Sequence, residues 1–262
     1  MGYADLHIHT IYSYDGTSSV EAVLKYVAEY TDLDVIAITD HDCITGALKA
    51  QDLAPAYGIE VVPGVEVSTS DGHVLALYIE QPVPAGLSLI ETALRVGELG
   101  GLCIAAHPMA AGTSSLDFKT IHAALEHAEV RRILVGVERF NGGLVYTRRN
   151  PWVEAMASAL PLAQIGNSDA HVLRMIGQGA TYFPGTTAAE LRDALERATT
   201  EVRKGHGLGG VEVLRDFIPR YLLRKMGWVV HNSGPHAPLR LTRMSQALQN
   251  PMLGSAHGAH MR

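Results

Sequence analysis

The sequence has few cysteines, no long apolar run and no overall excess of basic residues. Two cysteines provide no disulfide framework, so a reducing cytoplasm is the expected compartment. No apolar stretch approaches the roughly 20 residues that a membrane helix needs. The N-terminus also lacks the basic-then-apolar order of a secretory signal. We therefore expect a cytoplasmic protein without a membrane partner.

The charge is distributed unevenly along the chain. The formal charge is −6, but residues 1–200 hold 12 Lys and Arg against 24 Asp and Glu, whereas residues 201–262 hold 9 against 3. An acidic body with a basic C-terminal part is not typical of a general nucleic-acid binder. The acidic body is better suited to holding cations.

The first 200 residues alternate short apolar runs with amphipathic helical segments. Such repeated strand–helix units predict an α/β fold with a parallel sheet, either a barrel or an open doubly wound sheet. The expected strands lie at 3–9, 34–39, 59–67, 73–79, 102–107, 133–138 and 162–168. The expected helices lie near 18–31, 44–57, 87–99, 117–128, 151–159 and 187–198. Ser18 with Glu21 and Thr187 with Glu190 fit the capping box that starts a helix.

The pattern changes after about residue 200. We therefore predict one domain at 1–200 and a C-terminal extension at 201–262. The extension contains a Gly-rich loop, then a basic amphipathic helix over 211–228 that Pro219 interrupts, and a flexible tail from His231.

The stretch DLHIHT at residues 5–10 places two histidines on either side of one apolar residue. Residues two apart in a strand point to the same face, so His7 and His9 are expected to lie side by side. Two neutral imidazoles at that distance can bind one metal ion. Taken alone, the pair is equally consistent with a polar strand edge, so the rest of the chain has to decide.

A further set of histidines and acids of the body follows the ends of predicted strands. In a parallel barrel these ends share one mouth, where active sites are built, and in an open sheet they share one edge. His73 begins a strand instead, and reaches the mouth if that strand returns antiparallel from Glu66. The residues concerned are His7, His9, Asp15, Asp40, His41, Glu66, His73, His107, Glu138, Asp169 and His171.

Each of these residues has an ordinary explanation by itself, as a helix cap, a surface ion pair or a buried hydrogen-bonded histidine. Together they are different, because carboxylates crowded at one mouth repel one another unless cations are present. Nine candidate ligands exceed the three that one catalytic zinc takes, and suit two or three ions bridged by a carboxylate. The ligand set has no thiolate, so zinc, manganese and iron remain open.

Six motifs, in order, resemble those of the PHP (polymerase and histidinol phosphatase) family over about residues 3–200. They are DLHIHT, TDHD, PGVEVS, GHVLALY, AAHP and NSDAH. The resemblance is closest to the small stand-alone phosphoesterases of this family. It implies a distorted (β/α)7 barrel with a trinuclear metal site at its C-terminal mouth.

The resemblance also implies how the ligands are shared. A first ion would be bound by His7, His9, Glu66 and Asp169. Glu66 would bridge to a second ion held with His73 and His107, and a third ion would be bound by Asp15, His41 and His171. Asp40 would orient a ligand histidine. Whether Glu138 belongs to the site is left open.

The function that we expect is metal-dependent hydrolysis of phosphate esters by metal-activated water. The candidate substrates are phosphomonoesters, nucleoside bisphosphates and short oligonucleotides, including short RNA. The sequence indicates no obligate protein partner. We expect three residues to act in catalysis. Glu66 would bridge the metal ions, and Asp169 or His171 would protonate the leaving alcohol. Arg148 and Arg174 are the arginines chosen to orient the phosphate.

Two alternatives remain. An amidohydrolase also opens with a His-x-His motif, but often bridges its metals with a lysine on a central strand. All five lysines here fall in predicted helices or loops, which favours the phosphoesterase. The other alternative is a non-catalytic metal-binding PHP module. All nine expected ligand positions are filled, which argues against such loss of function.

Overall fold

The structure is a computed structural model that describes residues 1–110, 115–143, 150–205, 208–231 and 240–248. Within these ranges, nine strands form one curled sheet in the order β7-β6-β5-β4-β3-β2-β1-β8-β9. The strands are β1 (Gly2–Asp5), β2 (Val35–Ile38), β3 (Glu60–Ser68), β4 (His73–Leu77), β5 (Leu102–Ala105), β6 (Leu134–Asn141), β7 (Ala163–Asn167), β8 (Gly179–Phe183) and β9 (Glu201–Lys204). All seven predicted strands are therefore present.

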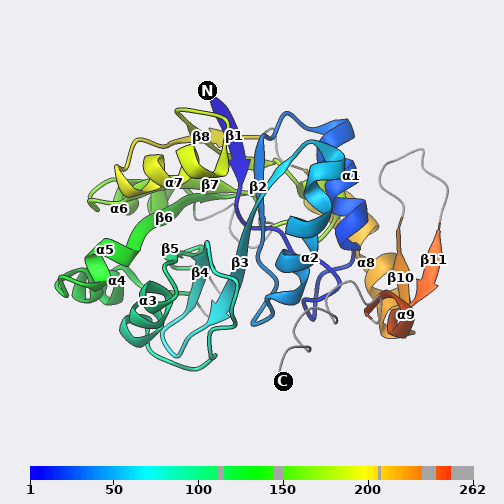
Figure 1. Cartoon of the computed structure of the whole chain (residues 1–262), viewed down its shortest axis with the longest axis horizontal. Helices are drawn as coiled ribbons and strands as arrows, with labels where there is room; N and C mark the ends of the chain where they lie inside the picture. Colours follow the sequence, from blue (N-terminus) through cyan, green and yellow to red (C-terminus); the bar gives the residue numbers. More distant parts are fainter. Residues whose placement is uncertain (111–114, 144–149, 206–207, 232–239, 249–262) are drawn as a thin grey trace, which may run out of the picture.

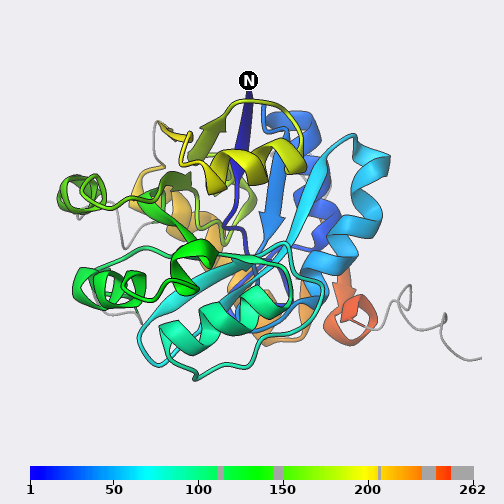
Figure 2. The same ribbon diagram turned by 60° about the vertical axis from the view of Figure 1, so that its left-hand side comes forward.

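Helices cover the outside of this sheet (Figures 1 and 2). They are α1 (Val20–Tyr30), α2 (Thr45–Leu53), α3 (Leu89–Glu98), α4 (Phe118–Leu125), α5 (Val130–Ile133), α6 (Asn150–Ala157) and α7 (Ala188–Glu196). None of the helices in the described part of the chain has the length and hydropathy needed to cross a bilayer.

The sheet is nearly closed into a barrel because β7 approaches β8. The hydroxyl of Thr181 accepts from the Gly166 amide at 3.1 Å and donates to the Gly166 carbonyl at 2.9 Å. A side chain on Gly166 would place its Cβ 2.5 Å from the Ala180 carbonyl oxygen, so only glycine permits this approach. β8 and β9 were not predicted; β8 pairs antiparallel with β1, and β9 pairs antiparallel with β8.

The end at which the parallel strands begin is covered by α7. Leu191 and Leu195 of α7 pack in one buried cluster with side chains of the strands, such as Leu75 and Ile104. The α7 N-terminus is tied to this end because the Ala188 amide donates to the Glu60 carboxylate at 2.5 Å. The opposite end, where the parallel strands finish, carries the polar residues.

Side-chain caps start α1, α3, α4 and α7, and one of the two predicted capping boxes differs from the structure. The Thr187 and Glu190 capping box at α7 is confirmed. The box predicted at Ser18 and Glu21 is wrong by one residue, since Ser19 caps α1 by accepting from the Ala22 amide. The Ser18 carbonyl instead accepts a hydrogen bond from the Ile11 amide, and Ser18 forms an isolated parallel β-bridge with Val230.

Beyond the body, the predicted basic helix is present as α8 (Gly210–Lys225), which contains Pro219. β10 (Trp228–Val230) lies before the expected tail and pairs in a hairpin with β11 (Leu241–Arg243), which lies within it together with the short α9 (Met244–Leu248). Residues 232–239 and 249–262 of the expected tail lie outside the described residues. β9 joins the main sheet just beyond residue 200, and the division there stays a prediction.

Candidate metal centre

The strand ends bring all nine predicted ligands to one mouth. β3 and β4 pair antiparallel with Ser68 opposite His73, as predicted, so His73 returns to the mouth beside Glu66. The other ligands follow β1, β2, β5 and β7 or belong to β3. They are His7, His9, Asp15, His41, Glu66, His107, Asp169 and His171.

Glu66 lies at the centre of the cluster and is 1% exposed. Its Oε2 is 3.1 Å from His7 Nε2, 3.2 Å from His9 Nε2 and 3.2 Å from His41 Nδ1. Its Oε1 is 2.8 Å from both His73 Nδ1 and His107 Nε2. One buried carboxylate thus faces five imidazoles that come from four different parts of the chain.

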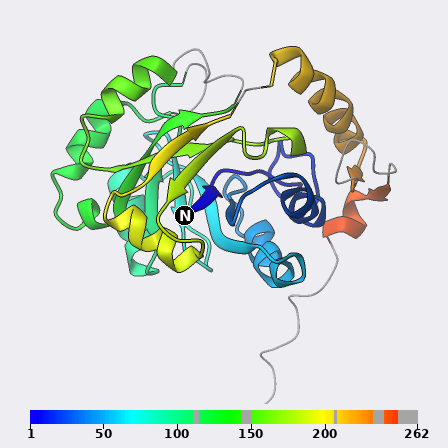
Figure 3. The same cartoon turned by 90° about the horizontal axis from the view of Figure 1, so that it is seen from above.

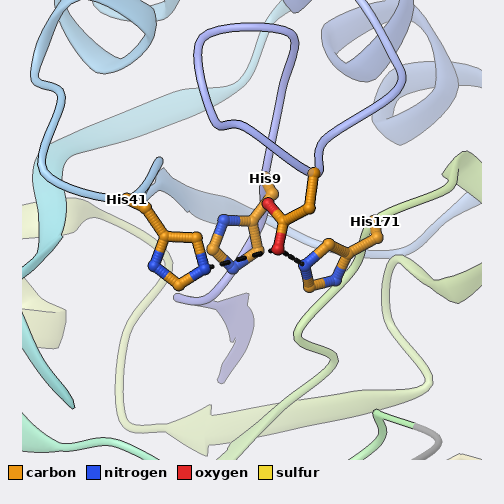
Figure 4. A group of neighbouring side chains, drawn as sticks. His9, His41 and His171 are labelled. Atoms are coloured by element: carbon orange, nitrogen blue, oxygen red, sulfur yellow. Dashed lines mark hydrogen bonds and ion pairs between the residues drawn. The ribbon is translucent and has the colours of Figure 1, made fainter. Parts of the chain in front are cut away.

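Two aspartates complete the cluster on either side. Asp169 Oδ1 lies 3.1 Å from His9 Nε2 and 3.4 Å from His7 Nε2. Asp15 Oδ2 lies 3.1 Å from His171 Nε2 and 3.5 Å from His41 Nε2. Figure 4 shows His9, His41 and His171 gathered around one carboxylate.

The donor atoms fit divalent cations. Four overlapping groups each have their ligand atoms within 4.8 Å of one another: His9–Asp15–His41–His171, His7–His9–Glu66, His7–His107–Asp169 and His41–Glu66–His73. We call the first of these the Asp15 group. Among the described residues, Oε2 of Glu66 and buried ring nitrogens of four of the histidines make no hydrogen bond of acceptable geometry, although most of them lie in the charge contacts given above. A bound cation would accept the lone pairs of these atoms.

The grouping differs in detail from the one that the resemblance implied. His9 joins the Asp15 group, and His41 faces both Asp15 and Glu66 through its two ring nitrogens. The assignment of each ligand to a particular ion therefore stays a prediction.

The backbone at the mouth is locally strained. His107 has φ 27°, Asp169 has φ 50°, and Asp42, next to His41, has φ 51°. Residues with a Cβ rarely adopt this left-handed region, at a cost of roughly 1–3 kcal/mol each, and they tend to cluster at functional sites. Sequence patterns carry no sign of these conformations.

Glu138, which the sequence left open, is a hydrogen-bond hub behind the ligands. Its Oε1 lies 2.9 Å from His7 Nδ1, and its Oε2 accepts from the His107 amide at 2.6 Å. Side-chain amides of Asn167 and Asn141 also donate to it, at 2.7 and 3.1 Å. This contact on Nδ1 directs His7 Nε2 toward the cluster, so Glu138 orients a ligand. Its place at the end of the predicted strand 133–138 was the only sequence signal, whereas β6 itself continues to Asn141.

Asp40 is buried and accepts from the Thr10 amide at 2.5 Å and the Thr10 hydroxyl at 2.7 Å. Both bonds reach the residue after His9 rather than an imidazole. Arg174 lies 3.2 Å from Asp216 and 3.4 Å from Glu212, both on α8. Its role toward phosphate stays a prediction, and Arg148 lies outside the described residues.

The opposite charges in the cluster raise the pKa values of His7 and His9 and lower that of Asp169. Burial opposes protonation of His9, but Asp169 and Glu66 outweigh it and raise the pKa of His9 to about 10. Burial likewise opposes protonation of His7, whose pKa Asp169 and Glu66 raise well above 6.5. Burial disfavours ionised Asp169, yet His7 and His9 hold its pKa well below the usual range. Without a metal, protons on the imidazoles balance the carboxylates.

Metal affinity should therefore fall as the pH is lowered, with proton release on binding. Ligand imidazoles must be neutral, whereas metal-free His9, with a pKa of about 10, is protonated at neutral pH. The raised pKa stabilises the metal-free fold fully below pH 6.5, and this contribution is lost as the pH rises toward 10. Calorimetric titration with Mn²⁺ in two buffers of different ionisation enthalpy should give different heats. Identical heats would contradict the expectation.

The fold and the cluster together define an α/β barrel protein with a histidine and carboxylate centre at its mouth. The profile of the PHP domain family matches residues 5–204, and the chain belongs to this family. The resemblance predicted from six motifs is thus confirmed. Residues 210–248, which hold α8, the hairpin and α9, lie beyond the match.

Known relatives share this domain to different extents. An uncharacterized protein of Methanocaldococcus jannaschii is 39% identical over 137 residues, 48% of this chain and 80% of that protein. A phosphoribosyl 1,2-cyclic phosphate 1,2-diphosphodiesterase of Eggerthella lenta is 35% identical over 96 residues, 34% of this chain and 36% of the enzyme.

A solved structure confirms the predicted barrel fold. It is a two-domain protein of Bacteroides vulgatus, described as containing a predicted PHP-like metal-dependent phosphoesterase. It superposes with a TM-score of 0.58 at 19% identity, covering 92% of this chain and 75% of that one.

Proposed function

We propose that this protein is a metal-dependent phosphoesterase that hydrolyses a small phosphorylated substrate. The observation that carries the proposal is the cluster of imidazoles around buried Glu66, whose four overlapping groups of ligand atoms fit cations. Membership of the PHP domain family supports the reaction class, as does the cyclic phosphodiesterase named among the relatives. The substrate class is a phosphomonoester, a nucleoside bisphosphate or a short oligonucleotide. The cytoplasmic location stays a prediction.

Two or three ions of manganese, zinc or iron would be held by the four donor groups, which share His7, His9, His41 and Glu66. When bound, such ions supply a nucleophilic water near neutral pH and neutralise phosphate oxygens. Glu66 is placed to bridge, because each of its two oxygens faces different imidazoles. Its burial keeps bulk water from competing for these contacts.

Asp169 or His171 stays the proposed donor of the leaving alcohol's proton, and this role requires that the residue be protonated and not bound to an ion at that step. The His171 side chain is 22% exposed and the Asp169 side chain 7%, so an incoming substrate reaches His171 first. His171 Nδ1 lies 2.9 Å from the Asp169 carbonyl, which can only accept, so Nδ1 carries the proton. This contact orients the ring and turns Nε2 toward Asp15.

The proposal is tested by assaying wild-type protein, with added Mn²⁺ and after chelation, on four compounds. These are p-nitrophenyl phosphate, adenosine 3′,5′-bisphosphate, short oligoribonucleotides and a dihydroorotate-like ring amide. We expect metal-dependent turnover of at least one phosphoester and none of the amide. Turnover of the amide alone would favour an amidohydrolase, and bound metal without any turnover would favour the non-catalytic module.

A further inference from the structure

Helix α8 of the C-terminal extension contacts two of the three loops that carry the Asp15 group, those of Asp15 and His171, although α8 lies outside the residues matched by the family profile. Figure 3 shows α8 at the edge of the molecule, continuing into the hairpin beside α1. The Phe217 ring centroid lies 6.5 Å from that of His171, and Asp216 pairs with Arg174 in the same loop. α8 is therefore a neighbour of the candidate site.

Arg224 joins α8 to the other loop. Its Nη1 donates to the Ile11 carbonyl at 2.8 Å and to the Gly16 carbonyl at 3.0 Å. These two carbonyls flank the segment that holds Ser13 and Asp15. One guanidinium nitrogen thus ties together both ends of the segment 11–16.

The conformation of this segment decides where the Asp15 carboxylate points. The Ser13 hydroxyl donates to Asp15 Oδ1 at 2.7 Å, which leaves Oδ2 facing His171 and His41. Gly16 closes the turn so tightly that a Cβ there would lie 1.8 Å from the Thr10 carbonyl oxygen. The segment 11–16 keeps this conformation only if its two ends stay close together, and the two hydrogen bonds from Arg224 keep them close.

We propose that Arg224 is a positioning residue for the Asp15 group. By holding the Ile11 and Gly16 carbonyls together, it keeps Asp15 at bonding distance from a cation shared with His41 and His171. The inference rests on the proposed role of the cluster in binding ions. Arg224 would thus give the C-terminal extension a role in binding the ion of the Asp15 group, and no role in the groups around Glu66.

The test compares three full-length variants by equilibrium dialysis over a range of free Mn²⁺, with bound ions counted by elemental analysis. Asp15→Asn identifies which ion depends on the Asp15 group. Arg224→Gln should weaken that same ion about ten- to hundred-fold, as expected for a residue that orients a ligand, and leave the others bound. Arg215→Gln, which removes an exposed charge from the same helix, should match wild type.

Hydrogen exchange gives a second readout. The Ile11 and Ser13 amides donate to the Ser18 and Thr10 carbonyls, so they should exchange faster in Arg224→Gln than in Arg215→Gln. Should Arg224→Gln fail to fold, Arg224→Lys takes its place, with a smaller loss of the same ion. A folded Arg224 variant with wild-type ion binding, or with all ions weakened equally, overturns the proposal.

These measurements need no substrate, so they separate the two proposals. A wild-type protein that binds its ions but hydrolyses no phosphoester would defeat the proposed function alone. Selective loss of one ion in Arg224→Gln would still establish Arg224 as a positioning residue.

Discussion

Glu66→Gln should reduce phosphoester hydrolysis by at least about a thousand-fold in kcat/KM, more than the ten- to hundred-fold expected for a residue that only orients a ligand. Five imidazoles face the Glu66 carboxylate within 3.2 Å. The neutral amide removes the negative charge that these groups share and offers one acceptor oxygen where the carboxylate has two. An ion on either side of residue 66 would then lose its bridge.

The measurement is steady-state turnover of the best phosphoester, with bound metal counted on the same samples. Glu126→Gln, an exposed substitution on the residue after α4, is the matched control and should behave like wild type. Since Glu66 is buried, thermal unfolding of both variants must show a cooperative transition. Near wild-type turnover in a folded Glu66→Gln protein would refute the central role of this carboxylate.

Removal of the metal should lower the midpoint of thermal unfolding as well as abolish turnover. A ligand present at a thousand times its Kd, and bound only by the folded state, stabilises a protein by about 4 kcal/mol. For a chain of this size that corresponds to roughly 10 °C in Tm. The effect is expected because the cluster joins segments from across the chain, from His7 to His171.

Differential scanning fluorimetry of chelated and Mn²⁺-loaded protein measures this shift, and adding Mn²⁺ back should restore both Tm and turnover. Glu66→Gln should show a smaller shift at the same free Mn²⁺, because it has lost the shared ligand. Full turnover and an unchanged Tm after complete chelation would contradict a functional metal centre.

The strand pattern of the body could be derived from the sequence because strands leave a local signature. Runs such as DVIAIT and LCIAAH are apolar, short and bounded by polar residues, and both are strands in the structure. β9 carries Glu201, Arg203 and Lys204, so its polar sequence gave no such signal. It exists because it pairs with β8, which only the assembled sheet can supply.

The candidate ligands were also derivable from the sequence, because parallel strands deliver their C-terminal residues to one mouth whatever the loops do. His9, His41 and Asp169 could therefore be grouped without coordinates. Glu138 could not be assigned, because orienting His7 depends on a 2.9 Å contact between residues 131 positions apart. Arg174 was chosen for phosphate, yet its partners on α8 are some 40 residues further along the chain.

By itself, the sequence determined the family, the barrel and the set of imidazoles and carboxylates at its mouth, since these follow from local periodicity and from six ordered motifs. Only the tertiary structure decided which atoms face one another, that His107 and Asp169 adopt left-handed backbone, and that Arg224 ties α8 to the Asp15 segment. The physical reason is that such contacts join distant residues through directional hydrogen bonds, which leave no periodic trace along the chain.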